Sequence, residues 1–187
     1  MKGPRTSPSP AHWPLPGTSL PEEEVSMGHL KHNIRIDAPV DKVWEFSHDP
    51  HNWPTFMVGM SEPDKITGDG GVGTQVEFTM LMAGVHMRET CRVAGDRRDP
   101  DGGGHWRGDF TGPSSGWMTW DSKPENGGTL VTQEMEYTVP GSVLGKVVDR
   151  LIYEKRQERD MLHSLENLKL LMEESPSSAP AGWDEHE

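Results

Sequence analysis

Residues 34–56 read IRIDAPVDKVWEFSHDPHNWPTF, and this stretch decides how the fold begins. Polar and apolar residues alternate over residues 29–37, which predicts a strand that ends inside the stretch. Pro39 follows at once, and its fixed backbone angle suits the first turn of a helix. The apolar spacing of residues 39–47 predicts that helix, and residues 51–56 predict a second helical turn. The chain therefore opens as a strand followed by two short helices.

The middle of the chain is patterned as β-structure. Residues 73–82 and residues 85–93 each alternate, and the Ala-Gly pair between them is typical of a hairpin turn. Turns rich in glycine separate three more expected strands, at residues 106–110, 116–121 and 129–139. Together with the first strand, these make six.

The last patterned element is a long helix. Residues 142–173 contain no proline and predict one continuous helix. At about 100° per residue, one stripe of this helix carries Leu144, Val147, Leu151, Leu162, Leu165 and Lys169. We expect that stripe to face the sheet. The element order predicts an α+β fold in which a curved antiparallel sheet covers the long C-terminal helix.

The length and the proline distribution indicate one domain between two tails. The chain has 187 residues, enough for one domain with a substantial core. Residues 1–26 hold six of the 16 prolines and show no periodic pattern, which predicts a disordered tail. Residues 174–187 predict a second, acidic tail. The domain is therefore expected at residues 27–173.

Charge and composition exclude several classes of partner. The formal net charge of −12 argues against nucleic acid and against anionic lipid surfaces as partners. No apolar run is long enough for a transmembrane helix. The first residues lack the apolar core of a signal peptide, so we expect a cytoplasmic protein. The oligomeric state is left open by the sequence.

Three phrases of the core carry a resemblance to a known superfamily. They are the stretch quoted above, the Gly-Gly-Thr strand with Glu-Tyr at residues 127–137, and SLENLKLLME at residues 164–173. Together they resemble the SRPBCC superfamily of START domains, polyketide cyclases and Bet v1-like proteins, in particular its polyketide cyclase/dehydrase-like members. The resemblance covers residues 29–173 and implies the helix-grip fold. It also implies a cavity between sheet and helix that takes a hydrophobic small molecule such as a lipid, quinone or polyketide.

The inward faces of the expected strands supply candidate ligand-binding residues. They are rich in methionine, whose flexible thioether suits a cavity for irregular apolar ligands. The candidates on the strands are Val76, Phe78, Met80, Met82, Met87 and Met135, and those on the helices are Trp53, Phe56, Leu151 and Glu158. For any single residue of this set, ordinary core packing is the alternative.

Glu158 lies in a polar gap of the long helix. Residues 153–160 are charged or polar apart from one tyrosine, and Glu158 falls near the centre of the expected buried stripe. In a helix-grip protein the middle of this helix can face the cavity, so Glu158 is expected to line it. The alternative is a segment whose charges are solvated or paired along the helix.

Glu89 and Tyr137 are the candidate catalytic or ligand-orienting residues. Glu89 falls on the apolar face of its strand, where burial raises the pKa of a carboxyl group and suits it to hydrogen bonding or acid–base work. The alternatives are a bulge that turns Glu89 to solvent, or pairing with an arginine. Tyr137 falls on the inward face of the last expected strand.

No metal or cofactor site is expected. His48 and His51 lack a set of carboxylates or cysteines at ligand spacing. Cys91 is the only cysteine, so the chain forms no internal disulfide, and we expect a buried thiol without chemistry.

These residues leave three classes of function open. The first is a module that binds or carries a hydrophobic small molecule. The second is an enzyme resembling a polyketide cyclase/dehydrase, in which Glu89 or Tyr137 assists enolisation and loss of water from a bound poly-ketone. The third is a protein-interaction module. Binding leads, because the sequence shows no positioned acid–base pair.

Overall fold

A computed structural model describes residues 25–82, 84–140 and 150–174. These residues form seven strands and three helices. In chain order they are β1 (Val25–Ile36), α1 (Val40–His48), α2 (Trp53–Phe56), β2 (Lys65–Thr67), β3 (Gln75–Met82), β4 (Val85–Arg98), β5 (Gly104–Thr111), β6 (Ser115–Glu125), β7 (Gly128–Pro140) and α4 (Arg150–Glu173).

The predicted elements are confirmed, with one addition; most strands are longer than predicted, whereas β3 begins two residues later, at Gln75. β1 begins at Val25, two residues inside the segment assigned to the N-terminal tail. The three-residue β2 was not predicted from sequence, because so short a strand carries no readable alternation. Residues 142–149 of the predicted helix, with Leu144 and Val147, lie outside the described residues, as do residues 1–24 and 175–187.

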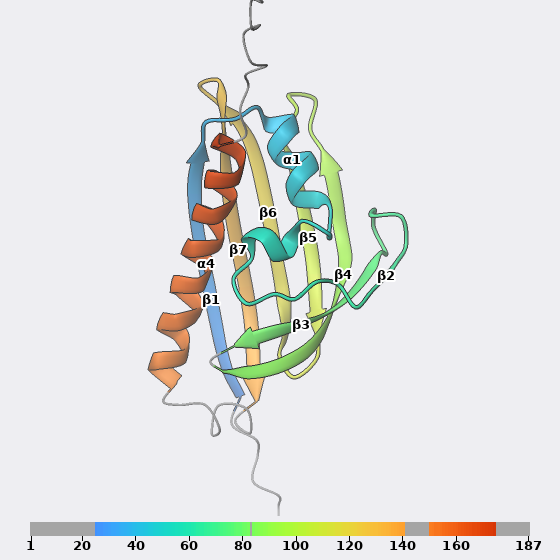
Figure 1. The fold of residues 1–187 in the computed structure, drawn as a ribbon, viewed down its shortest axis with the longest axis vertical. Coiled ribbons are helices and arrows are strands. Elements are labelled where there is room, and N and C mark those ends of the chain that lie inside the picture. The colour runs from blue at the N-terminus through green and yellow to red at the C-terminus, as the bar shows by residue number, and fades with distance from the viewer. Residues whose placement is uncertain (1–24, 83, 141–149, 175–187) are drawn as a thin grey trace, which may run out of the picture.

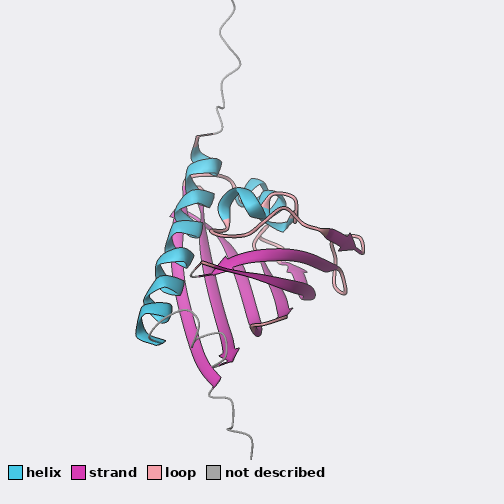
Figure 2. Ribbon diagram, turned by 60° about the horizontal axis from the view of Figure 1, so that its bottom comes forward, coloured by secondary structure: helices cyan, strands magenta, loops and turns pink. Residues whose placement is uncertain are grey.

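The strands form a single antiparallel sheet in the order β1-β7-β6-β5-β4-β3-β2. α1, α2 and α4 all lie on one face of this sheet, and α4 runs beside β1 and β7 (Figure 1). β3 and β4 curve away from the plane of the other strands, so the sheet wraps around the helices (Figure 2). Among the described residues, no helix is long and apolar enough to cross a membrane.

The core fills the space between the sheet and the helices at the end near α1. Ile36, Val43, Val76 and Leu168 are fully buried there. Tryptophans supply much of the remaining volume, and the rings of Trp53 and Trp106 meet edge to face, as aromatic quadrupoles favour. The buried tryptophans are Trp44, Trp53, Trp106 and Trp120.

The buried face of α4 differs from the predicted stripe, which is wrong for Leu151 and Leu162 and right for Leu165. Leu151 is 56% exposed and Leu162 is 38% exposed, although both were assigned to the sheet side. The residues that are buried on this helix are Tyr153, Met161, Ser164, Leu165, Leu168 and Met172. This face is rotated by about 100°, or one residue, from the predicted one. The helix face could not be predicted from apolar residues alone, because the face that is buried in the structure includes polar side chains.

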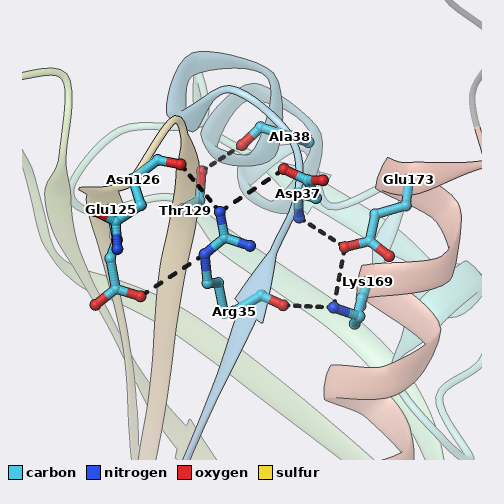
Figure 3. A network of polar contacts seen from close by, with 8 residues as sticks. All are labelled: Arg35, Asp37, Ala38, Glu125, Asn126, Thr129, Lys169 and Glu173. Atoms are coloured by element: carbon cyan, nitrogen blue, oxygen red, sulfur yellow. Dashed lines mark hydrogen bonds and ion pairs between the residues drawn. The ribbon is translucent and has the colours of Figure 1, made fainter.

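Polar contacts fix the C-terminal end of α4 against β1 (Figure 3). Lys169 Nζ donates to the carbonyl oxygen of Arg35 at 2.7 Å, and the Asp37 amide donates to Glu173 Oε1 at 2.6 Å. Lys169 and Glu173 also pair with each other at 3.0 Å, one helical turn apart. Arg35 reaches the other way and donates to the carbonyl oxygen of Asn126 at 3.1 Å. The end of α4 is therefore held while its N-terminal half extends along the sheet.

Candidate functional site

A cavity of about 100 Å³ lies between α4 and the strands β3 to β7. α4 contributes one wall through Gln157, Asp160, Met161 and Ser164. The segment of residues 57–60, which follows α2, contributes another wall. The space is partly open to solvent.

The segment of residues 57–60 is held on two sides. The Val58 amide donates to Ser164 Oγ of α4 at 3.0 Å. On the other side, the Leu81 amide of β3 donates to the carbonyl oxygen of Gly59 at 2.7 Å. This segment therefore bridges α4 and β3 and closes one side of the cavity.

Methionine dominates the lining. Six of the 11 methionines line the cavity, and they come from the 57–60 segment, three strands and α4. They are Met57, Met60, Met80, Met118, Met135 and Met161. Because an unbranched thioether adopts many rotamers at low cost, these walls can adjust to ligands of different shape.

Glu89 is the buried acid of the cavity. It lies on β4 opposite Phe78 and is only 5% exposed. Ser114, in the turn before β6, donates its hydroxyl hydrogen to Glu89 Oε1. Burial raises the pKa of Glu89 above its usual value, and the hydrogen bonds from Ser114 oppose that rise. The bulge that would have turned Glu89 outward is absent at this position, since the register of β4 and β5 shifts only between Val93 and Gly95.

Gln133 brings a second polar group to the lining. It lies on β7 and is 2% exposed. Its Nε2 donates to the sulfur of Met118 at 2.7 Å, while Oε1 is buried without a hydrogen-bond partner among the described residues. A buried amide oxygen without a partner is costly, so a ligand that donates a hydrogen bond here would relieve that cost.

Tyr137 lines the cavity, and its ring packs against a glycine of the neighbouring strand. Gly28 of β1 pairs with Tyr137 of β7, and a Cβ atom at Gly28 would overlap the tyrosine ring. The ring also meets Tyr153 of α4 edge to face, with 6.0 Å between centroids. Met87 belongs to the same small cluster. The absence of a side chain at Gly28 therefore lets the Tyr137 ring lie against β1.

A smaller recess of about 10 Å³ lies next to the cavity, at the end near α1 and α2. It shares four lining residues with the cavity: Met57, Met60, Phe110 and Met118. The other residues around it are Ser47, His48, Trp53, Phe56, Trp106 and Trp120. The recess is therefore walled largely by aromatic rings.

The structure brings five of the 12 predicted site residues together in the cavity. Five line the cavity: Phe78, Met80, Glu89, Met135 and Tyr137. Trp53 and Phe56 line the recess instead. Val76 is buried in the core, and Met87 is buried beside Tyr137 without lining the cavity.

The two candidates on α4 do not line the cavity, and one strand candidate lies outside the description. Leu151 is exposed, and the Glu158 carboxylate is half exposed and lies 3.4 Å from His32 Nε2. Both predictions depended on the helix face corrected above. The side chain of Met82 is not among those described.

Several lining residues were missed by the sequence analysis. Met57, Met60 and Ser114 lie in connections, where no periodicity marks which side chain points inward. Gln133 lies two residues before Met135 on a strand whose inward face was predicted, so the alternation could have found it. Met118 lies on a strand whose phase the sequence did not fix. Met161 and Ser164 follow from the corrected helix face.

His48 and His51 were considered for metal binding, and Cys91 as a thiol. Among the described residues, no group of three His, Cys, Asp or Glu side chains is placed to hold a metal ion. Cys91 is buried, and burial raises the pKa of its thiol to about 12. The thiol is therefore protonated at neutral pH and a poor nucleophile.

Comparison with known protein families shows to which family the chain belongs. The family model described as "Polyketide cyclase / dehydrase and lipid transport" matches residues 27–173. The chain belongs to this family. Its resemblance to the SRPBCC superfamily is therefore confirmed. No curated protein matches the chain.

Solved structures share the fold of this family member at low sequence identity. The Zhui aromatase/cyclase from Streptomyces sp. R1128 is 20% identical, with 79% of this chain and 94% of that chain covered and a TM-score of 0.59. A START superfamily protein from Mycobacterium smegmatis is 12% identical, with 78% and 97% covered and a TM-score of 0.61. Truncated norcoclaurine synthase from Thalictrum flavum is 18% identical, with 84% and 100% covered and a TM-score of 0.55. The helix-grip fold is therefore confirmed.

Proposed function

We propose that this protein binds a hydrophobic or aromatic small molecule in the cavity between α4 and the sheet. The observation that carries the proposal is the lining itself: six methionines contribute to a wall that is mostly apolar, with some polar side chains among them. Among those groups, Glu89 and Gln133 are buried to 95% or more. An apolar pocket with a small number of fixed polar groups is the usual form of a ligand site. The family's description, which includes lipid transport, agrees with binding.

The volume of the cavity limits how much of a ligand is enclosed. A dry apolar cavity of about 150 Å³ holds one benzene molecule. The cavity here is about 100 Å³ and partly open, so one aromatic ring or a short alkyl segment fits inside with small movements of the methionines. A longer lipid, quinone or polyketide would extend through the opening.

The test is calorimetric titration of the full chain with ethylbenzene and 4-ethylphenol. In the variant Met135→Trp an indole fills part of the cavity, and we expect the affinity for both probes to fall by about 10-fold or more. Met27→Trp places the same indole on β1 at a methionine that is 59% exposed, and it should bind as the wild type does. Wild-type binding by a folded Met135→Trp protein would refute the proposed site.

A second candidate function is supported by the state of Glu89. A buried carboxyl with a raised pKa beside a ligand cavity can take a proton from carbon next to a ketone and return a proton to a departing hydroxyl. With a bound poly-ketone, the enolate carbon adds to a second ketone group of the chain, and the carboxyl returns its proton to the new alkoxide, which gives a β-hydroxyketone. Removal of a further proton from the carbon next to the remaining ketone and its delivery to the departing hydroxyl then form a carbon–carbon double bond and release water. Tyr137 lines the same cavity and would donate a hydrogen bond to the ketone oxygen.

Glu89→Gln separates the two functions. Gln keeps a hydrogen-bond acceptor for Ser114 but cannot exchange a proton. If the protein is a dehydrating cyclase, the variant should lose at least about 100-fold in turnover of a synthetic poly-ketone while it still binds that compound. Equal turnover in both proteins would remove Glu89 from a catalytic role and leave binding as the function.

A further inference from the structure

One residue that lines the recess has a buried ring nitrogen without a hydrogen-bond partner among the described residues. His48, at the end of α1, is among the residues that line this recess. His48 Nδ1 lies 2.8 Å from the carbonyl oxygen of Trp44. A carbonyl oxygen only accepts, so Nδ1 carries the hydrogen and Nε2 presents a lone pair. Nε2 is buried and has no hydrogen-bond partner among the described residues.

The surroundings keep this imidazole neutral and fixed. Its ring stacks on Trp44 with 3.5 Å between centroids and meets the edge of Trp106 at 6.3 Å. Burial lowers the pKa of His48 to about 4, and the nearby Arg98 guanidinium acts in the same direction. At neutral pH, Nε2 is therefore a hydrogen-bond acceptor on a residue of the recess wall, which is otherwise formed by aromatic rings, three methionines and Ser47.

We propose that the recess is the inner subsite of the ligand cavity, and that His48 Nε2 accepts a hydrogen bond from a hydroxyl group carried on the aromatic ring of the ligand. This inference rests on the proposed function, since it assigns the inner end of the same ligand. It names the ligand class as a hydroxylated aromatic compound rather than a plain hydrocarbon.

The size of the recess favours a hydroxyl group over a ring. Its volume of about 10 Å³ matches one water-sized group. The ligand ring then stays in the larger cavity, and only its hydroxyl enters the recess. The walls between the two spaces are Phe110 and three methionines, Met57, Met60 and Met118, whose side chains can move to admit it.

The position of the recess determines how the ligand is oriented in the cavity. Glu89 and Ser114 line the cavity but not the recess, and His48 lines the recess but not the cavity. A ligand with its hydroxyl on His48 therefore presents its other groups to Glu89, Gln133 and the opening. The same orientation serves a carrier and an enzyme.

The test compares three probes by calorimetric titration of the full chain: ethylbenzene, 4-ethylphenol and 4-ethylanisole. Only 4-ethylphenol can donate a hydrogen bond. We expect the affinity ratio of 4-ethylphenol to ethylbenzene to fall by about 3- to 10-fold in His48→Phe, which keeps a stacking ring but has no acceptor. 4-Ethylanisole should bind more weakly than 4-ethylphenol to the wild type, because its methyl group exceeds the recess. His51→Phe is the matched control, since the His51 side chain is 72% exposed and lies outside both spaces.

The outcomes separate this inference from the proposed function. Failure of all three probes to bind would overturn the proposed function and the subsite with it. Binding of all three probes with an unchanged ratio in His48→Phe would overturn the subsite and leave the cavity site standing.

A second measurement on the wild type keeps the inference testable if His48→Phe does not fold. In ¹⁵N spectra of the histidine rings, 4-ethylphenol should move the Nε2 resonance of His48, and ethylbenzene should move it much less. The other eight of the nine histidines serve as internal references. An Nε2 resonance that responds equally to both probes, or to neither, would overturn the assignment.

Discussion

Replacing Leu168 by alanine is expected to destabilise the protein by about 3–5 kcal/mol, because it leaves a cavity at a fully buried position. Leu168 lies on α4 and belongs to the core cluster that joins this helix to the sheet. Loss of that packing removes transfer free energy and leaves unfilled space beside rigid neighbours. Urea unfolding followed by tryptophan fluorescence measures the change.

Leu162→Ala is the matched control on the same helix. Leu162 is 38% exposed, so its truncation should cost about 1 kcal/mol or less. The apolar stripe predicted from sequence gives the opposite order, since it contains Leu162 and lacks Leu168. A larger loss for Leu162→Ala would therefore contradict the helix orientation in the structure and restore the predicted stripe.

The fold was predictable because its elements have strong local patterns. The alternation of β3 and β4 correctly predicted the inward side chains of Phe78 and Glu89, since a strand repeats every two residues. The face of α4 was not predictable in the same way. Its inward residues include Tyr153 and Ser164, so the residues that face the cavity do not form an apolar stripe.

The correctly predicted residues of the cavity all lie on strands, and the predicted Trp53 and Phe56, which line the recess, lie on α2. Ser114 lies in a turn and contacts Glu89 from 25 residues away in sequence. Met57 and Met60 follow a four-residue helix whose packing on α4 is a tertiary effect. His48 was considered only as a metal ligand, because its burial in an aromatic recess depends on α1 lying over β5 and β6. Such contacts carry no periodic signal in the sequence.

Acidification from pH 7 to about pH 3.5 is expected to remove about 3 kcal/mol of stability through His48, because its pKa falls from the ordinary 6.5 to about 4 on folding. Burial disfavours the charged imidazolium, so the unfolded chain binds this proton more readily than the folded one. The contribution is fully present above pH 6.5, declines as the pH falls toward 4, and is lost below that. The charges near the ring are Arg98, which also disfavours protonation, and Asp41, which pairs with Arg98.

His48→Phe should lack this part of the acid sensitivity, whatever its stability at neutral pH. The readout is the difference between wild type and variant in the free energy of unfolding, measured by urea at several pH values from 7.5 to 3.5. Glu89 acts in the opposite direction in both proteins, because its raised pKa favours the folded state when the carboxyl is protonated. The contribution of Glu89 therefore cancels when the free energies of unfolding of wild type and His48→Phe are subtracted. A wild-type minus variant difference that does not change between pH 7 and 4 would contradict the burial of the His48 ring.

The methyl resonances of methionine test most directly whether the cavity is the ligand site. The full chain, labelled with ¹³C at the methionine methyl groups, would be titrated with 4-ethylphenol. The account predicts that Met57, Met60, Met80, Met118, Met135 and Met161 shift together at the ligand concentrations that saturate calorimetric binding. Met27 on the surface of β1 and Met172 near the end of α4 should stay unchanged. Saturable binding that moves Met27 or Met172 and leaves the six cavity methyl groups in place would contradict it.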